Sequence, residues 1–225
     1  MIVHEQVYNQ LGHRADGSLV NAGWIRNLGT SVTRAVSYDP ELGGQLMAVP
    51  VPEIATLRTS VLATVAKATP LPPAGKPMTL VADGASAVDI ELVFAASSAA
   101  SDTSSSVSSA CGASVTVLGG AATVVLSRPA DLRRPATIAI TGGGRNLCKG
   151  SFPLPANLND LSLRVLVDGA VVEAFAAGGR GVCSVGVQAA ASPTAVLVAA
   201  AGGGGLDDAA ATTMLNATVH NMSAI

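Results

Sequence analysis

The 225-residue chain carries two carboxylates, Asp168 and Glu173, five positions apart in its most regular stretch. Two carboxyl groups held close together could act as a general acid and a general base. The local pattern favours a structural role, because Asp168-Gly169 is a two-residue signal for a tight β-hairpin turn. With Asp168 and Gly169 at the centre of that turn, Glu173 would lie directly opposite Arg164. The sequence therefore predicts an ion pair that orders two strands.

The stretch 161–187 around these carboxylates predicts three consecutive strands. Apolar and polar residues alternate from residue 161 to residue 168, which is the period of a β-strand. Gly178-Gly179 marks a second turn, after which a third strand runs from Arg180 to Val187. Because one face of this meander is apolar throughout, it must cover a second layer of structure.

The histidines and cysteines do not have the spacing of a metal site. His4, His13 and His220 are isolated, and the three cysteines are too scattered for zinc ligands. No metal or cofactor is expected. Three unpaired thiols are the favoured interpretation of the cysteines. The alternative is one disulfide with one cysteine left over, and all three pairings of Cys111, Cys148 and Cys183 stay open.

Charge and hydropathy argue against two classes of partner. A net charge of −2 offers no electrostatic reason to bind nucleic acid or anionic lipid. The most apolar window, residues 189–206, contains Pro193 and four consecutive glycines, so it is not a membrane-spanning helix. No signal-peptide pattern follows Met1. We expect neither a nucleic-acid partner nor a membrane partner.

Short strand-like runs separated by turn signals continue through most of the chain. With almost no helical period, they predict an all-β protein, an antiparallel β-sandwich over residues 59–225. A Ser/Ala run, 96–109, is predicted to be a loosely ordered insertion. The proline-rich segment 59–77 is predicted to be a surface connection. The further predicted strands are 78–81, 87–95, 114–118, 122–127, 137–141, 195–200 and 216–219.

The N-terminal part predicts a hairpin followed by a short helix. Residues 32–38 and 45–51 are strand-like runs on either side of a Pro/Gly turn. Pro52 can occupy the first position of a helix whose buried face would be Ile54 and Leu57.

The meander resembles the C-terminal sandwich of glycoside hydrolase family 32, which contains invertases, inulinases and levanases. The family pattern is close to L-R, three hydrophobic residues, D-x-S-x-V-E-x-F, and then a G-G-R turn. Ala170 replaces the family's serine. The residues that match are Leu163, Arg164, Asp168, Val172, Glu173, Phe175, Gly178, Gly179 and Arg180.

A second segment is similar to the same family, in the correct order along the chain. The family carries G-W, then R-x-L-S-(W/Y)-D, then L-x-x-x-P-x-x-E-x-x-x-L-R, at the end of a five-bladed β-propeller. The resemblance implies that residues 1–58 are a hairpin remnant of the last blade with its linker helix. The rest of the propeller would be a partner domain in cis. The residues that match are Gly23, Trp24, Arg34, Ser37, Tyr38, Asp39, Leu46, Pro50, Glu53, Leu57 and Arg58.

The resemblance implies retaining hydrolysis of β-fructofuranosidic bonds in sucrose or fructans. The family's carboxylates lie in N-D-P-N-G, E-C and R-D-P motifs, and none of these occurs here. Asp39-Pro40 follows Tyr38 in the hairpin turn and is not the R-D-P site. No catalytic residue is therefore predicted. We expect the C-terminal part of such an enzyme, inactive alone, in which the sandwich braces the propeller or forms the subunit contacts of a homo-oligomer.

The alternative is a freestanding, non-catalytic sandwich that binds carbohydrate or serves as a structural or dimerising module. Sugar-binding modules usually present Trp or Tyr faces to sugar rings. No Trp or Tyr occurs from Thr59 onward, which counts against the binding role.

Two triplets near the C-terminus, Asn216-Ala-Thr and Asn221-Met-Ser, match the N-glycosylation sequon. The resembled family is largely secreted or vacuolar, so the resemblance implies an exocytic route on which both asparagines are candidate acceptors.

Overall fold

The computed structural model describes residues 9–25, 29–73, 75–82, 87–95, 111–131, 133–158, 160–187, 195–201 and 212–223. The predicted insertion 96–109 lies outside these residues. No helix among them is long and apolar enough to cross a membrane.

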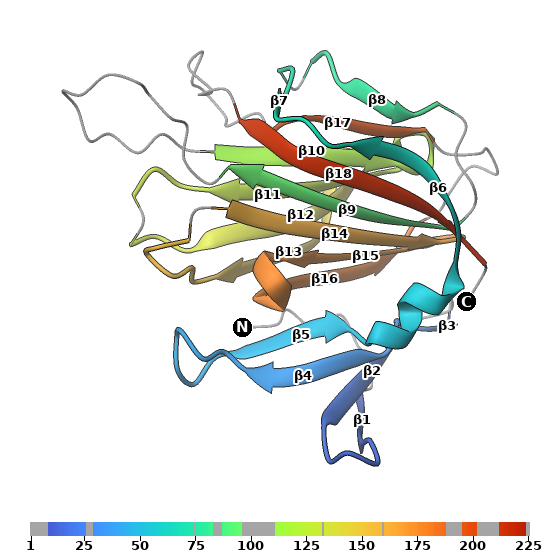
Figure 1. Ribbon diagram of the computed structural model, residues 1–225, viewed down its shortest axis with the longest axis vertical. Coiled ribbons are helices and arrows are strands. Elements are labelled where there is room, and N and C mark those ends of the chain that lie inside the picture. Colours follow the sequence, from blue (N-terminus) through green and yellow to red (C-terminus); the bar gives the residue numbers. More distant parts are fainter. Residues whose placement is uncertain are drawn as a thin grey trace.

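Two antiparallel sheets stack face to face and form the sandwich (Figure 1). The strand order of the first sheet is β16-β15-β14-β9-β18-β6, with β7 paired beside β18, and the order of the second is β13-β12-β11-β10-β17-β8. The all-β sandwich prediction is confirmed. The strands of the first sheet are β6 (Arg58–Val65), β7 (Thr69–Pro70), β9 (Ala87–Ala95), β14 (Asp160–Asp168), β15 (Val171–Ala176), β16 (Gly181–Gly186) and β18 (Thr213–Met222). Those of the second are β8 (Met78–Val81), β10 (Cys111–Val117), β11 (Ala122–Arg128), β12 (Ala136–Gly142), β13 (Arg145–Phe152) and β17 (Val196–Ala200).

Alternating side chains of both sheets form the main core. In β9, every second residue from Val88 to Phe94 is at most 2% exposed and packs against the facing sheet. Strands β6, β7 and β13 were not predicted, and the prediction that 59–77 is only a surface connection was wrong where β6 and β7 form. Strands β6 and β13 are edge strands in which most residues are exposed or half-buried, so apolar and polar residues do not alternate along them.

The β14–β15 hairpin forms at the predicted place but in a different register. Asp168 pairs with Val171, so the two central turn residues are Gly169 and Ala170. Gly169 has φ of 54° and Ala170 has no positive φ. This matches a type II′ turn, which needs glycine only at its first central position. The predicted centre at Asp168-Gly169 was therefore wrong.

A disulfide joins the two sheets at one edge of the sandwich. Cys148 of edge strand β13 bonds to Cys183 of edge strand β16, with 5.8 Å between their Cα atoms. Cys111 is buried and is not part of this disulfide. The favoured interpretation of three unpaired thiols was wrong, because Cys148 and Cys183 become neighbours only when the sheets stack. A crosslink across a loop of this size typically stabilises a fold by about 2–4 kcal/mol.

The N-terminal segment forms a third, smaller sheet. Its strands β1 (Asn9–His13), β2 (Leu19–Ile25), β4 (Arg34–Tyr38) and β5 (Leu46–Pro50) pair antiparallel in chain order, and β3 (Gly29–Thr30) pairs with β2. Four antiparallel strands are the composition of one propeller blade. The sheet thus contains three strands, β1, β2 and the two-residue β3, beyond the predicted hairpin. We call the segment 9–50 the blade sheet.

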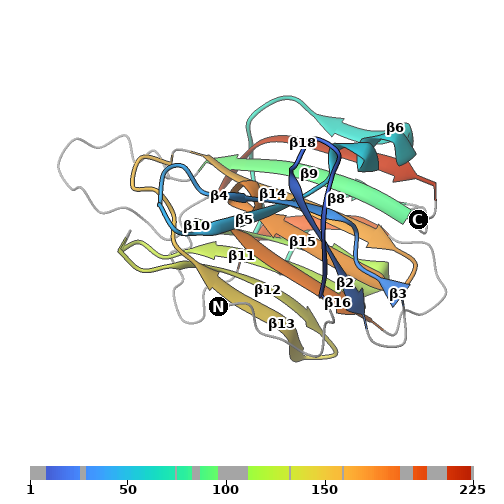
Figure 2. The ribbon, with the colours of Figure 1, turned by 90° about the horizontal axis from the view of Figure 1, so that it is seen from below.

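The blade sheet lies across the outer face of the seven-stranded sheet (Figure 2). The short 3₁₀ helix η1 (Pro52–Leu57) follows it and has Pro52 in its first turn, as predicted. A second apolar cluster lies between the blade sheet and the sandwich. It comprises Val32, Val51, Ile54, Ala87, Leu166, Phe175 and Met222. The division at residue 58 remains a prediction, although β6 starts there.

Gly179 marks a close backbone approach between the two units. It lies in the 3₁₀ turn η3 (Ala177–Gly179) and has φ of 89°. A Cβ atom there would lie 2.5 Å from the carbonyl oxygen of Ala48 in β5. Gly178 has φ of 68°, but a Cβ atom there would meet nothing within 4 Å.

These two glycines give a matched test of blade docking. Gly178→Ala should cost about 1–2 kcal/mol of unfolding free energy, because alanine is strained at positive φ. Gly179→Ala should cost more, because β5 must also move away from the new methyl group. Urea unfolding of both variants measures the difference. Equal losses would show that the contact with Ala48 contributes nothing to stability.

Candidate functional site

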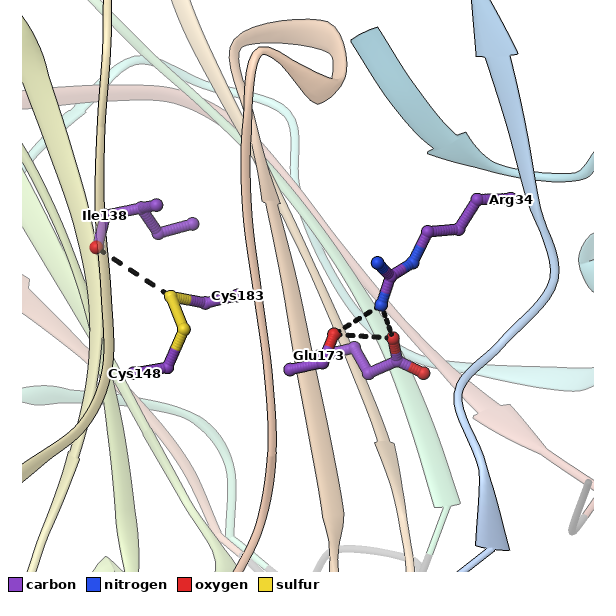
Figure 3. The surroundings of a disulfide bond; sticks show 6 residues. Arg34, Ile138, Cys148, Glu173 and Cys183 are labelled. Carbon is purple, nitrogen blue, oxygen red and sulfur yellow. Dashed lines mark hydrogen bonds and ion pairs between the residues drawn. A yellow bond between two sulfur atoms is a disulfide. The ribbon is translucent and has the colours of Figure 1, made fainter. Parts of the chain in front are cut away.

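Two of the predicted motif residues, Glu173 and Arg180, hold the blade sheet against the seven-stranded sheet. The Glu173 carboxylate is 3% exposed and lies under the start of β4 (Figure 3). It accepts hydrogen bonds from the Val32 N–H at 2.5 Å, from Arg34 Nη2 at 2.5 Å and from Ser184 Oγ at 2.8 Å. Two of the three donors belong to the N-terminal segment. The buried Glu173 carboxylate of the sandwich therefore receives most of its hydrogen bonds from the blade sheet.

Phe175 supports the same contact. Its ring is 3% exposed and belongs to the apolar cluster between the two units. The Arg34 guanidinium carbon lies 5.4 Å from the ring centroid, within the range of a cation–π interaction. Arg34 thus meets a carboxylate and an aromatic face at once, and both come from β15.

Arg180 makes a second clamp at the other end of the β4–β5 hairpin. Its Nε and Nη2 donate to the two Asp39 oxygens at 2.5 and 3.0 Å, and Nη2 also donates to Glu41 at 2.7 Å. Asp39 is 2% exposed and also accepts from the backbone N–H groups of Glu41 and Leu42. The hydrogen bonds from Arg180 lower the pKa of Asp39 to about 2, although burial acts in the opposite direction.

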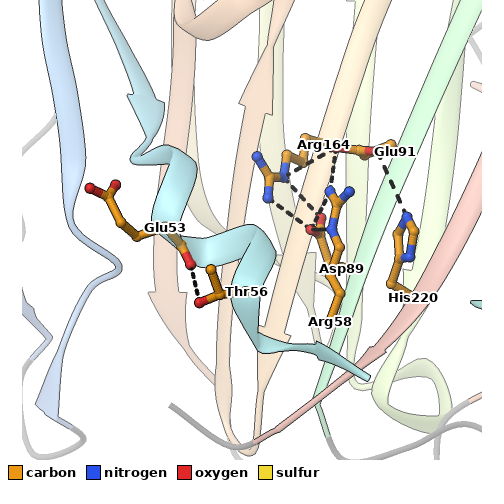
Figure 4. Close-up of polar contacts among 7 residues, drawn as sticks. All are labelled: Glu53, Thr56, Arg58, Asp89, Glu91, Arg164 and His220. Carbon is orange, nitrogen blue, oxygen red and sulfur yellow. Dashed lines mark hydrogen bonds and ion pairs between the residues drawn. The ribbon is translucent and has the colours of Figure 1, made fainter. Parts of the chain in front are cut away.

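A third cluster lies beside η1, on β6, β9, β14 and β18 (Figure 4). Asp89 is fully buried and accepts two hydrogen bonds from Arg164, at 2.9 and 2.8 Å, and one from Arg58 at 2.8 Å. Glu91 accepts from Arg58 at 2.5 Å and has His220 4.0 Å away. Burial would lower the pKa of Arg58, but the hydrogen bonds to Glu91 and Asp89 raise it.

The predicted pair of Arg164 and Glu173 does not form. In the observed register Arg164 lies opposite Phe175, and Glu173 lies opposite Leu166. The shift follows from the turn, whose centre lies one residue later than predicted. The two charges instead find partners far along the chain, Asp89 for Arg164 and Arg34 for Glu173.

The remaining predicted site residues shape turns or occupy β18. Asp168 ends β14, Gly169 forms the hairpin turn, and Gly178 and Gly179 form η3. Asn216 is exposed and Asn221 is half-buried, on one strand. Asp89 and Ser184 were not singled out from the sequence as contact residues. The signal available for Asp89 was a carboxylate, one of two with Glu91, inside a largely apolar strand.

The geometry of these carboxylates favours a role in ion pairs over a role in acid–base catalysis. A general acid or base must exchange its proton near the working pH, whereas a carboxylate that accepts hydrogen bonds from arginine is stabilised in its charged form. Asp39 is such a carboxylate, because the hydrogen bonds from Arg180 lower its pKa to about 2. The Glu173 and Asp89 carboxylates accept hydrogen bonds from Arg34 and from Arg164 and Arg58. Among the described residues, no three His, Cys, Asp or Glu side chains are grouped as metal ligands would be.

The lowered pKa of Asp39 predicts how acid weakens blade docking. The folded-state pKa of Asp39 is about 2 and lies below the ordinary value of ~3.9. The ionised carboxylate therefore contributes its full share to the free energy of unfolding above about pH 5, and this share is lost as the pH falls towards 2. Asp39→Asn should lower the free energy of unfolding at pH 7 and should make it depend less on pH between pH 5 and pH 2. Urea midpoints measured from pH 7 to pH 2 test it, and Arg180→Ala should flatten the profile in the same way. A variant profile parallel to that of the wild type would contradict the assignment.

We compared the sequence and the structure with those of known proteins. No protein-family model and no curated protein matches the sequence. Solved structures do match. Fructan 1-exohydrolase IIa from Cichorium intybus has a TM-score of 0.70 at 16% identity, over 97% of this chain and 48% of that one. Sucrose-6-phosphate hydrolase from Lactobacillus gasseri has a TM-score of 0.63 at 16% identity, over 97% of this chain and 41% of that one.

A GH32 β-fructofuranosidase from Bombyx mori matches similarly, with a TM-score of 0.62 at 14% identity, over 97% of this chain and 41% of that one. The chain thus spans a little under half the length of these enzymes. The resemblance to glycoside hydrolase family 32 is confirmed at the level of the fold: this chain has the fold of the part of those β-fructosidases that contains the β-sandwich.

Proposed function

We propose that the chain is the C-terminal part of a retaining β-fructosidase, which hydrolyses β-fructofuranosidic bonds in sucrose or fructans. In this proposal the sandwich braces the propeller. The observation that carries it is the pair of clamps, in which Glu173 and Arg180 of the sandwich hold the β4–β5 hairpin of the blade sheet. The shared fold and the two sequence motifs support the same assignment.

The two clamps hold both ends of one hairpin. Glu173 binds the start of β4 through Val32 and Arg34, and Arg180 binds the turn through Asp39 and Glu41. Two separated contacts fix the rotation of the blade sheet as well as its distance from the sandwich. Small displacements of reacting groups can cost about 10²-fold in rate. A brace of this kind would therefore act on catalysis by positioning, without touching the substrate.

The catalytic carboxylates would lie outside this chain. None of the three carboxylate motifs of the resembled family occurs in the sequence. The arginine-paired carboxylates described above are suited to docking. Binding and cleavage of sucrose or fructan are thus assigned to the propeller in cis, and the freestanding sugar-binding sandwich is the less supported alternative.

Activity measurements test this proposal directly. The purified chain should release no fructose from sucrose or inulin, because it lacks the nucleophile and acid that retaining glycosidases need. Turnover at ordinary enzymatic rates of ~1–10³ s⁻¹ would contradict the proposal. When the chain is joined to the propeller portion of a family member, Glu173→Gln should lower kcat and thermal stability together. Lys149→Gln, on the exposed edge strand β13, is the matched control and should change neither.

Subunit contact through the sandwich is a second role, carried by edge strand β6. Val61 and Leu62 are 58% and 38% exposed there, and no charged residue follows Arg58 in this strand. By contrast, edge strand β13 carries Arg145 and Lys149, charges of the kind that discourage edge pairing.

Sedimentation velocity of the purified chain tests the contact through β6. A concentration-dependent dimer that Val61→Lys abolishes is expected. A wild-type chain that stays monomeric at every concentration would refute this role.

A further inference from the structure

The two N-glycosylation sequons lie on one strand, and the fold places their asparagines on opposite faces. Along β18, Ala217 and Val219 are at most 1% exposed and point into the main core. Asn216 and Thr218 alternate with them and belong to the outer face of the sheet. Asn216 is exposed and Thr218 is half-buried. The first sequon therefore presents its acceptor amide and its hydroxyl on the same solvent-facing side.

Asn221 lies on the inner face. It pairs with Val88 of β9, which is fully buried in the main core, and residues directly opposite each other share a face. Asn221 itself is half-buried, and its backbone carbonyl accepts a hydrogen bond from Thr59 Oγ1 at 3.2 Å. The next residue, Met222, is buried in the cluster between the blade sheet and the sandwich. An oligosaccharide on Asn221 would have to leave from between the two sheets.

The disulfide is an independent observation that points to the compartment in which N-glycans are added. Cys148 and Cys183 link the two sheets, and Cys183 is 1% exposed, so the bond belongs to the folded interior. Disulfides form and persist in oxidising compartments such as the endoplasmic reticulum lumen. A chain that acquires this bond there also meets the glycosylation machinery.

We propose that Asn216 is an N-glycosylation site of this protein and that Asn221 is not. The amide nitrogen of Asn216 would form a bond to the anomeric carbon of an oligosaccharide carried on a polyprenyl diphosphate. The bond from that carbon to the diphosphate oxygen breaks, the polyprenyl diphosphate leaves, and the amide nitrogen loses one proton. The glycan would project from the outer face of β18, on the side away from the main core.

The test uses the full chain, directed through the secretory pathway of a yeast host and recovered from cells and medium together. Treatment with peptide N-glycosidase F converts a glycosylated Asn to Asp, and tandem mass spectrometry of the peptide containing β18 locates the change. Conversion at Asn216 alone is expected. Asn216→Gln should abolish the mobility shift on gels, and Asn221→Gln should leave it unchanged.

Thr218 supplies a matched pair that leaves Asn216 in place. Thr218→Ser keeps the sequon and should retain the glycan, whereas Thr218→Ala removes the sequon and should lose it. The Cys148–Cys183 disulfide, read by non-reducing peptide mapping, shows that each variant entered the oxidising compartment and folded. Wild-type protein that carries the disulfide but has unmodified Asn216 would overturn the proposal, and so would a glycan on Asn221. None of these readouts depends on fructosidase activity, so the proposed function stands or fails separately.

Discussion

The buried carboxylate of Glu173 is the constraint on which the arrangement of the sheets depends. Removing a charge from water costs several kcal/mol, and the cost is offset only by good hydrogen bonds and an opposite charge. Here those partners are the Val32 N–H, Arg34 and Ser184, two of them in the blade segment. Without the blade sheet, β15 would present an unpaired carboxylate beside the apolar ring of Phe175. Loss of one partner from such a buried pair typically costs about 3–5 kcal/mol.

Docking of the blade sheet also explains why the central hairpin is buried on both faces. Every residue of β15 except Val171 is buried, including those that point away from the main core. The inner face packs on the six-stranded sheet, and the outer face packs on Val32, Val51 and Ile54. Further along the same sheet, at β9 and β18, the outer face carries half-exposed Glu91 and exposed Asn216. One sheet thus offers a docking surface at one edge and an open polar surface beside it.

Much of the fold could be predicted from local patterns. The alternation in β9 predicted its bounds and buried face, and Pro52 marked the start of η1. The spacing of Glu173 and Arg180 within a family motif also identified the residues that prove to be the clamps. Strands β6 and β13 were missed because edge strands need not alternate. Strand β1 was missed because no clear period runs through 1–20, and β2 was missed because apolar and polar residues do not alternate along Leu19–Ile25.

The sequence by itself determined most strands of the sandwich, the turns that glycine permits, and several of the charged residues that make the contacts. Only the tertiary structure decided their partners. Arg164 binds Asp89, 75 positions away, and Glu173 binds Arg34, 139 positions away. The same holds for the choice of Cys148 and Cys183 over the other two cysteine pairings. Hydropathy period and turn chemistry act within a few residues, whereas these contacts exist only after the sheets stack, so no local pattern could select them.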